Sequence, residues 1–304
     1  IIKLLHKVQK GSSVKVLILD DTVEGKTGKQ IEGSRSSLWS NKEKRTIKGI
    51  NVVSLNYSDG LSNIMLDFAI SMGKFAKVEV AEFTQKLDVR TTAYKRRVEI
   101  MKGKSQIAID MVNRAITSGI QADYLLVDSW YSKPIFIKEM NELGLKLITR
   151  IANNNKIWNF MDKEKTLDSI YQKYKKLKTS QNGTYGKKIK FKYFSVIVAH
   201  KNAGKLKIVF LKTKDKLIPI VSTDLEITDD EIIEIYKRRW DIEQGYKELR
   251  QHFGFGHEEN RIYEALIARI TLSFFTYNIV SYINRMSNEP KTIGGLFKDL
   301  ECEL

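Results

Sequence analysis

The chain has 304 residues, 42% of them hydrophobic, so it can bury a large core as one big domain or as a domain with an insertion. Lysine and arginine outnumber aspartate and glutamate by 52 to 36, and the net charge of +16 favours a polyanionic partner such as nucleic acid. A membrane fits less well because the sequence has neither an apolar run of about 18 residues nor a long amphipathic basic helix.

The first third of the chain predicts a small antiparallel sheet. Residues 14–20 form a short apolar run that closes on carboxylates, which predicts a buried strand ending at a sheet edge. The glycine- and serine-rich segment that follows predicts a flexible loop that could shape itself around DNA or a partner. Residues 50–59 and 61–71 flank Asp59-Gly60, a dipeptide favoured in tight hairpin turns. These runs predict a three-strand meander.

Helices and strands then alternate. After a less regular stretch with a candidate strand at 77–83, apolar spacing predicts a helix over 105–118. Residues 124–128 predict a second buried strand ending on an aspartate, residues 133–143 a helix that opens at a proline, and residues 145–151 another strand. This order, completed by a late helix, is that of an α/β, RNase H-like fold in which a mixed sheet is flanked by helices.

A β-rich insertion interrupts that order. Residues 152–223 contain a lysine-rich segment, Lys173–Lys192, and two strand-like runs, 191–200 and 205–214. We therefore expect a first part of the core over 1–151, the insertion over 152–223, and a second part of the core with C-terminal helices over 224–304. The lysines of the insertion indicate DNA contact or a solvated surface about equally well.

The C-terminal part predicts core packing. Residues 262–286 carry apolar residues at positions that suit a helix buried on nearly all sides. The single cysteine, Cys302, can form no internal disulfide and has no companions for a zinc cluster, as expected of a reducing cytoplasm.

The run from Tyr236 to Arg250 is the most informative segment. Read as one helix, it places charged side chains on the same face as core residues, beside an apolar stripe of Ile235, Ile242 and Leu249. A charge at the edge of a core persists only if it is paired, metal-bound or used. The alternatives are a buried ion-pair network and a functional site.

The spacing of four residues in this run resembles a known signature. Tyr236, Arg239, Glu243 and Arg250 stand at the interval Y-x2-R-x3-E-x6-K of one branch of the DDE-class insertion-sequence transposases, insertion-sequence family 4, with arginine replacing its lysine. Two other blocks resemble the acidic blocks of that family, and all three occur in its order. They are VLILDDTVEGKTGKQIEG, residues 16–33, and YLLVDSWYSKPIF, residues 124–136.

The resemblance implies three catalytic, metal-binding carboxylates, Asp20, Asp128 and Glu243. Cutting DNA requires stabilisation of charge on the attacking and leaving oxygens, and Mg²⁺, or Mn²⁺ in its place, does this through two ions held by carboxylate oxygens. Asp21 is the alternative first ligand. Asp20 and Asp21 could otherwise cap backbone amides, and Asp128 could cap a helix.

The resemblance also implies contacts with DNA. Arg239 suits an ordering contact to a phosphate or to a carboxylate, and Arg250 keeps the charge of the family's lysine but spreads it over a wider fork. Tyr236 could bond a phosphate or pack its ring, and Lys247 lies on the same run. Trp158 lies near the start of the insertion, where related enzymes stack an aromatic residue on an unpaired base, but no local motif aligns it to that role, so we take it as a core residue.

The sequence thus predicts a DNA transposase that cuts at transposon ends and transfers the strand into target DNA. Its partners are double-stranded DNA, as ends and target, and a second copy in a homodimer, without a membrane, in a prokaryotic cytoplasm at the nucleoid. An RNase H-like nuclease that only cuts and an inactive basic DNA-binding protein are the rivals. The chain begins without methionine, so we expect the family's N-terminal DNA-binding region to lie outside it.

Overall fold

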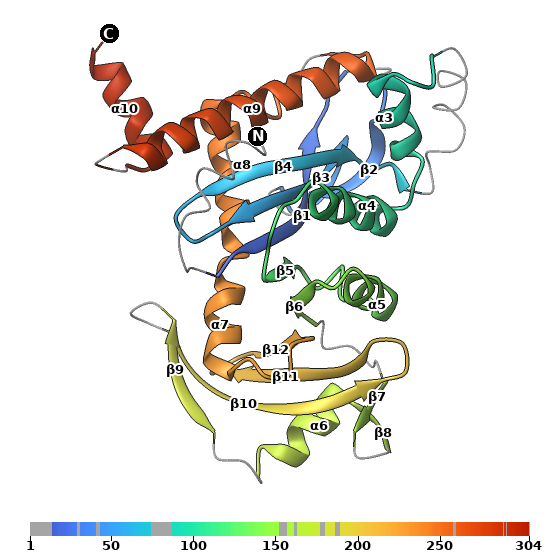
Figure 1. Cartoon of the computed structure of the whole chain (residues 1–304), viewed down its shortest axis with the longest axis vertical. Coiled ribbons are helices and arrows are strands. Elements are labelled where there is room, and N and C mark those ends of the chain that lie inside the picture. Colours follow the sequence, from blue (N-terminus) through green and yellow to red (C-terminus); the bar gives the residue numbers. More distant parts are fainter. Residues whose placement is uncertain are drawn as a thin grey trace. The chain divides into compact units, whose positions relative to one another are not determined.

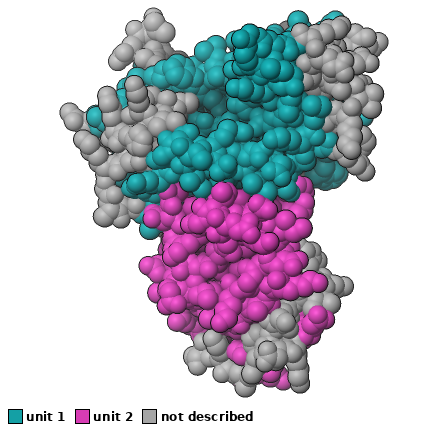
Figure 2. Space-filling model, turned by 45° about the vertical axis from the view of Figure 1, so that its right-hand side comes forward, with its two compact units in different colours: residues 1–121, 240–304 teal, residues 122–239 magenta. Residues whose placement is uncertain are grey.

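A computed structural model describes most of the chain. The described residues are 14–28, 31–40, 43–73, 87–151, 157–160, 163–176, 180–185, 189–257, 260–287, 289 and 291–303. The chain folds into two compact units, one of residues 1–121 and 240–304 and the other of residues 122–239 (Figure 2). We call them unit 1 and unit 2 and describe each by itself. From the expected order of helices and strands, the sequence places the boundaries of the insertion at residues 151 and 223, and that division stays a prediction.

The sheet of unit 1 is antiparallel. It consists of β1 (Val16–Gly25), β2 (Arg35–Ser40), β3 (Arg45–Ser58) and β4 (Asn63–Ile70). The long strand β3 pairs with all three others, and the turn between β3 and β4 has Gly60 at a φ of 85°. The predicted meander is confirmed. Sequence reasoning missed β2, which forms within the segment predicted to be a flexible loop.

The first strand is longer than predicted. Asp20 is in the middle of β1, where it pairs with Ser54, and the strand continues to Gly25. The expectation that the strand ends on its carboxylates at a sheet edge is wrong. The polar residues after Asp20 do not mark a turn. Every second one of them faces a helix that packs on β1, and these side chains form contacts with that helix.

Helices cover the sheet of unit 1 (Figure 1). The predicted helix over 105–118 is confirmed as α4, which packs on β3 and β4, whereas α8 packs on β1 and β4. Sequence reasoning missed α3, and the strand predicted at 77–83 lies outside the described residues. The helices are α3 (Thr92–Ile100), α4 (Lys104–Thr117), α8 (Trp240–His252), α9 (Tyr263–Met286) and α10 (Ile293–Glu303).

The helix α9 buries only one face. Phe274 packs on Phe68 of β4 with ring centroids 5.2 Å apart. On the other face Leu272, Phe275 and Ile283 are 54%, 45% and 60% exposed, so the prediction of burial on nearly all sides is wrong. Helix α9 has the length and composition of a membrane span, as many core helices do, and within the described chain it is the single helix that does.

An asparagine of α9 joins the edge of β4. Asn278 donates from Nδ2 to the carbonyl oxygen of Met65 at 2.7 Å, and its Oδ1 accepts from the amide of Met65 at 2.8 Å. Next to Met65 the register between β3 and β4 shifts, so that Leu66 is an extra residue in β4. One side chain therefore satisfies both backbone groups of a strand residue beside a bulge.

The predicted helix over Tyr236 to Arg250 is two helices. Helix α7 (Asp229–Lys237) ends at Arg238, and α8 begins at Trp240. At the junction the amides of Arg238 and Arg239 bond to carbonyls three residues back, at 3.0 and 3.1 Å, which tightens the last turn. The apolar stripe predicted across this run is confirmed, since Ile235, Ile242 and Leu249 are all buried.

Unit 2 contains one mixed sheet, in which β5 and β6 are parallel and the other paired strands are antiparallel. The strand order is β5-β6-β12-β11-β10-β7-β8, with β9 beside β10. Its strands are β5 (Tyr124–Val127), β6 (Lys146–Arg150), β7 (Ile157–Phe160), β8 (Lys163–Thr166), β9 (Gln181–Tyr185), β10 (Ile189–His200), β11 (Gly204–Lys212) and β12 (Leu217–Ser222). Its helices are α5 (Pro134–Glu142), α6 (Leu167–Tyr174) and α7.

The elements predicted for unit 2 are confirmed. The predicted strand, helix and strand after residue 123 form β5, α5 and β6, and the two strand-like runs of the insertion pair as the hairpin β10–β11. The class of fold is also confirmed: an α/β protein with a mixed sheet and flanking helices, in RNase H-like order, with additional strands before the helix that carries Glu243.

Candidate active site

The polar face of β1 lies under α8. Side chains alternate along a strand, so Asp20, Thr22 and Glu24 share one face. Arg250 of α8 contacts two of them: its Nη2 is 2.6 Å from Oε1 of Glu24 and 2.5 Å from Oγ1 of Thr22. Because Thr22 and Glu24 face α8, Asp20 lies on that face as well.

Helix α8 reaches Asp20 through a tyrosine. The hydroxyl of Tyr246 donates to the carbonyl oxygen of Asp20 at 3.2 Å. Burial and then the charge of Asp20 raise the pKa of Tyr246 well above its usual range, so the hydroxyl stays protonated as a donor. Glu243, half-buried, precedes Tyr246 by three residues on the same side of α8. The structure thus brings Asp20 and Glu243 to the same interface.

The neighbouring aspartate belongs to the opposite face. Asp21 forms an ion pair with Lys104 of α4, and both side chains are largely buried. A carboxylate neutralised in this way has less charge to offer a metal ion. This contact favours Asp20 over Asp21 as the metal ligand.

In unit 2, Asp128 follows the end of β5. Its Oδ1 accepts from the amide of Trp130 at 2.8 Å, and Thr149 donates to its carbonyl oxygen at 3.1 Å. The helix-cap alternative for Asp128 is wrong, because α5 begins at Pro134 with Lys133 at the N-cap position. The carboxylate therefore belongs to a turn at the end of a buried strand.

Tyr236 and Arg239 lie near Asp128. The hydroxyl of Tyr236 is 3.5 Å from the carbonyl oxygen of Val127. Burial raises the pKa of Tyr236 to about 12, the charge of Arg239 opposes this rise, and the charge of Asp128 adds to it. Asp128, Tyr236 and Arg239 are therefore electrostatic neighbours at the end of β5.

The three predicted ligands are divided between the units. Asp20 and Glu243 belong to unit 1, and Asp128 belongs to unit 2. In the part of the chain that the structure describes, no three His, Cys, Asp or Glu side chains group so that they could hold a metal ion. The carboxylates on the shared face of β1 and α8 have the hard oxygen donors that Mg²⁺ prefers, and so fit such an ion.

The other predicted contacts differ in setting. Arg250 forms an ion pair with Glu24, whose carboxylate is nearly buried. The alternative role for Arg250, a structural ion pair, therefore has a partner in the structure. Lys247 is exposed on α8. Trp158 is in β7 and pairs with Lys165, but its side chain lies outside the described residues. Their roles toward DNA stay predictions.

Two partners were missed from the sequence, Glu24 and Lys104. The signal for Glu24 was the alternation of polar residues at 20, 22 and 24, which is typical of a strand whose second face is also covered. Lys104 has no such signal, because it comes from α4, 83 residues away from Asp21.

The elements follow the order of an RNase H-like fold, with the three predicted carboxylates on β1, after β5 and on α8. The family model described as DDE superfamily endonuclease matches residues 2–174, and the model described as transposase DDE domain matches residues 102–279. Each match spans more than half of the chain, and the chain belongs to the DDE superfamily of transposases and endonucleases. Members of this superfamily act on DNA and use divalent metal ions. A search of curated proteins found no match.

Proposed function

We propose that this chain is the catalytic domain of an insertion-sequence transposase of the branch with the Tyr-Arg-Glu-Lys signature. It cuts a phosphodiester at the end of the element and joins the freed 3′ hydroxyl to target DNA. The observation that supports this most is the shared interface of β1 and α8. There Arg250 fixes the face on which Asp20 lies, and Tyr246 brings the turn that carries Glu243 to it.

In the proposed cleavage, a water oxygen attacks the phosphorus, the bond from phosphorus to the 3′ oxygen breaks, and the 3′ oxygen leaves as a hydroxyl. In strand transfer that 3′ hydroxyl attacks the phosphorus of a target phosphodiester and gives up its proton. The new bond joins the element to the target, while the bond from that phosphorus to the target's own 3′ oxygen breaks and leaves a 3′ hydroxyl on the target. Asp20, Asp128 and Glu243 would hold two Mg²⁺ ions, or Mn²⁺ in their place. When bound, these ions supply stabilisation of charge on the attacking and leaving oxygens.

The chain's own basic residues position the DNA. Arg239, whose charge acts on Tyr236 as does that of Asp128, has the planar fork that matches two phosphate oxygens. Lys247 extends from the exposed side of α8 and adds a point charge for the backbone. The hydroxyls of Tyr236 and Tyr246 hold the two strands that carry the aspartates.

The decisive experiment compares the parent with Glu243→Gln in a plasmid-nicking assay with Mg²⁺ and Mn²⁺. Changing a residue that only orients a metal ligand costs about 10- to 100-fold, so removing the charge of a ligand should cost at least about 100-fold. Folding, measured as Tm, and duplex affinity without metal should be unchanged, since the amide keeps the shape of the carboxylate. A folded variant that nicks like the parent would remove Glu243 from the active site.

A second assay separates the transposase from its rivals. A short duplex that already ends in the free 3′ hydroxyl should be joined to a target plasmid by the parent, and the reaction should shift the complex to the mass of two chains. Nicking without joining would identify a nuclease that only cuts. Binding without nicking would identify an inactive basic DNA-binding protein.

A further inference from the structure

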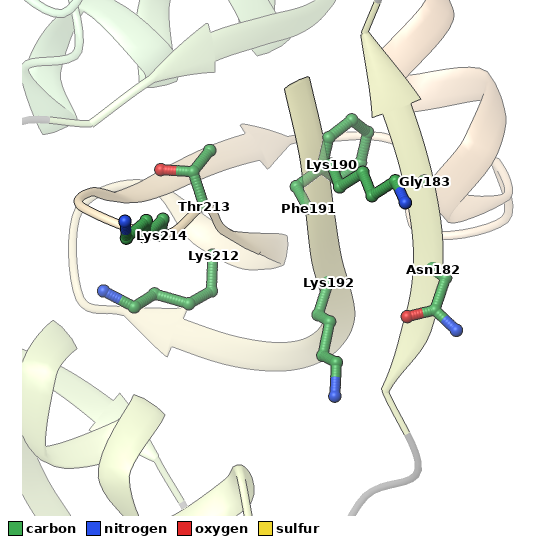
Figure 3. Close-up of a pocket in the computed structure, with 8 residues that line it drawn as sticks. All are labelled: Asn182, Gly183, Lys190, Phe191, Lys192, Lys212, Thr213 and Lys214. Atoms are coloured by element: carbon green, nitrogen blue, oxygen red, sulfur yellow. The ribbon is translucent and has the colours of Figure 1, made fainter. Parts of the chain in front are cut away.

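Strands β9, β10 and β11 of unit 2 border a pocket of about 670 Å³ (Figure 3). Four lysines from the two strands of the β10–β11 hairpin and the turn after it line the pocket: Lys190, Lys192, Lys212 and Lys214. No carboxylate is among the described residues that line it. A pocket of this size can hold a small organic ligand, and four lysines without a carboxylate beside them favour an anionic one.

Two of these lysines stand directly opposite each other on neighbouring strands. Lys192 is the direct cross-strand partner of Lys212, and on its other side it pairs with Asn182 of β9. Like charges directly opposite in a sheet are destabilising, and none of the described carboxylates forms an ion pair with any of the four lysines. Asn182, Lys192 and Lys212 thus stand side by side on three strands that are about 4.8 Å apart, and no described carboxylate pairs with either lysine.

The aromatic ring of Phe191, which lines the pocket, is already packed against the protein. Phe191 is 8% exposed, and its ring lies on Gly183, where an added Cβ would be 2.4 Å from the ring Cε2. Stacking of a base needs a free ring face. Lysine amines are strongly hydrated point charges that bind phosphate without reading bases. The pocket therefore offers recognition of charge and little recognition of a base.

We propose that this pocket binds consecutive phosphates of a nucleic acid strand and is insensitive to its sequence. The inference rests on the proposed function, which makes DNA the substrate. It places the phosphate contact of the insertion at Lys192 and Lys212, of which Lys212 lies outside the lysine-rich segment of the sequence. Free phosphate compounds share the recognised chemistry, so the test includes them.

The test is the salt dependence of duplex binding, measured by fluorescence anisotropy in the presence of a chelator so that no cleavage occurs. Lys192→Gln with Lys212→Gln should weaken binding and flatten the slope of log affinity against log salt by about 0.9 for each phosphate that is no longer neutralised. Lys192→Arg with Lys212→Arg should keep the parent slope. The matched control is Lys201→Gln with Lys205→Gln, which removes the same charge from the other end of the same hairpin.

Three results would overturn the proposal. The first is a glutamine variant, with the parent's Tm, whose slope equals that of the control. The second is a decrease in affinity that differs between duplexes of unrelated sequence. The third is inorganic pyrophosphate binding that disappears in the glutamine variant while the DNA slope stays the same, which would assign the pocket to a small phosphate compound.

Nicking distinguishes failure of this inference from failure of the proposed function. None of the three matched carboxylates lies in the pocket, so the glutamine variant should nick more slowly than the parent at low DNA concentration, and this deficit should shrink as the DNA concentration rises. A parent that binds duplex but never nicks would contradict the proposed function and leave the pocket in place. If the parent nicks DNA but the salt slope of the glutamine variant equals that of the parent, the result would contradict the proposal for the pocket and leave the proposed function in place.

Discussion

In both units a tyrosine hydroxyl holds the backbone of a strand that carries a predicted catalytic aspartate, but the two anchors differ in setting. In unit 1, Tyr246 is buried and its hydroxyl reaches the carbonyl oxygen of Asp20 at 3.2 Å. In unit 2, Tyr236 is half-buried and its hydroxyl is 3.5 Å from the carbonyl oxygen of Val127, the residue before Asp128. The first anchor is the tighter one.

The charges around the two anchors differ as well. On β1 the acidic neighbours of Asp20 are each matched by a cation, Asp21 by Lys104 and Glu24 by Arg250. Around Tyr236 the charged groups include two arginines, Arg239 and Arg150, along with Asp128. Unit 1 therefore pairs the acidic neighbours of its predicted ligand with cations, whereas in unit 2 two arginines and Asp128 are among the charged groups that act on Tyr236.

The largest expected effect tests the two faces of β1. Asp20→Asn should reduce nicking by at least about 100-fold if Asp20 is the metal ligand that we propose. Asp21→Asn is the matched control: it has the same chemistry one residue away, faces α4, and should lower stability by breaking its ion pair while nicking persists. Rates at saturating metal, with Tm for both variants, check this. A reversed pattern would make Asp21 the first ligand.

The next effect concerns the cation on the same face. Arg250→Ala should cost about 2 kcal/mol of unfolding free energy, because it leaves the nearly buried carboxylate of Glu24 without its partner. If Arg250 also holds phosphate by charge, Arg250→Lys should keep most activity while Arg250→Ala abolishes it. Denaturant unfolding and nicking measure the two roles separately.

The exposed Lys247, on the same helix, provides the control for that series. Lys247→Ala should leave stability within about 0.5 kcal/mol of the parent, as expected for a surface position. Equal stability of Arg250→Ala and Lys247→Ala would show that the ion pair with Glu24 contributes nothing measurable.

The smallest effect compares the anchors directly. Tyr246→Phe should cost about 1 kcal/mol, since it removes a buried hydrogen bond. Tyr236→Phe should cost less, because its contact is at the limit of hydrogen-bonding distance and the ring is half-buried. Chemical denaturation of both variants gives the order, and a larger destabilisation by Tyr236→Phe would make the anchor of unit 2 the tighter one.

The sequence predicts much of this fold because local patterns decide it. The helix α4 and the strands β5 and β6 follow from apolar spacing, and glycine with positive φ ends α4 at Gly119. The break at Arg238 and Arg239 was not predictable, because no proline or glycine marks it and helical spacing runs straight through. The exposed face of α9 was missed for a similar reason, since apolar side chains on every side do not reveal which of them find a partner.

The candidate site was predictable in its types of residue and less so in its contacts. Asp20, Asp128 and Glu243 were found through the spacing of motifs, and their assignment as ligands stays a prediction. The pairing of Arg250 with Glu24 depends on the packing of α8 against β1, which joins positions 226 residues apart. No periodicity within one element encodes such a contact.

The clamp of Asn278 on Met65 has a consequence for how copies of this chain meet. A sheet edge with unpaired backbone groups is a template on which another chain can add a strand, and proteins blunt such edges with bulges or covering elements. Here the amide side chain occupies the donor and acceptor of Met65, and the extra Leu66 bends the strand beside it. Both devices protect β4 against edge-to-edge aggregation.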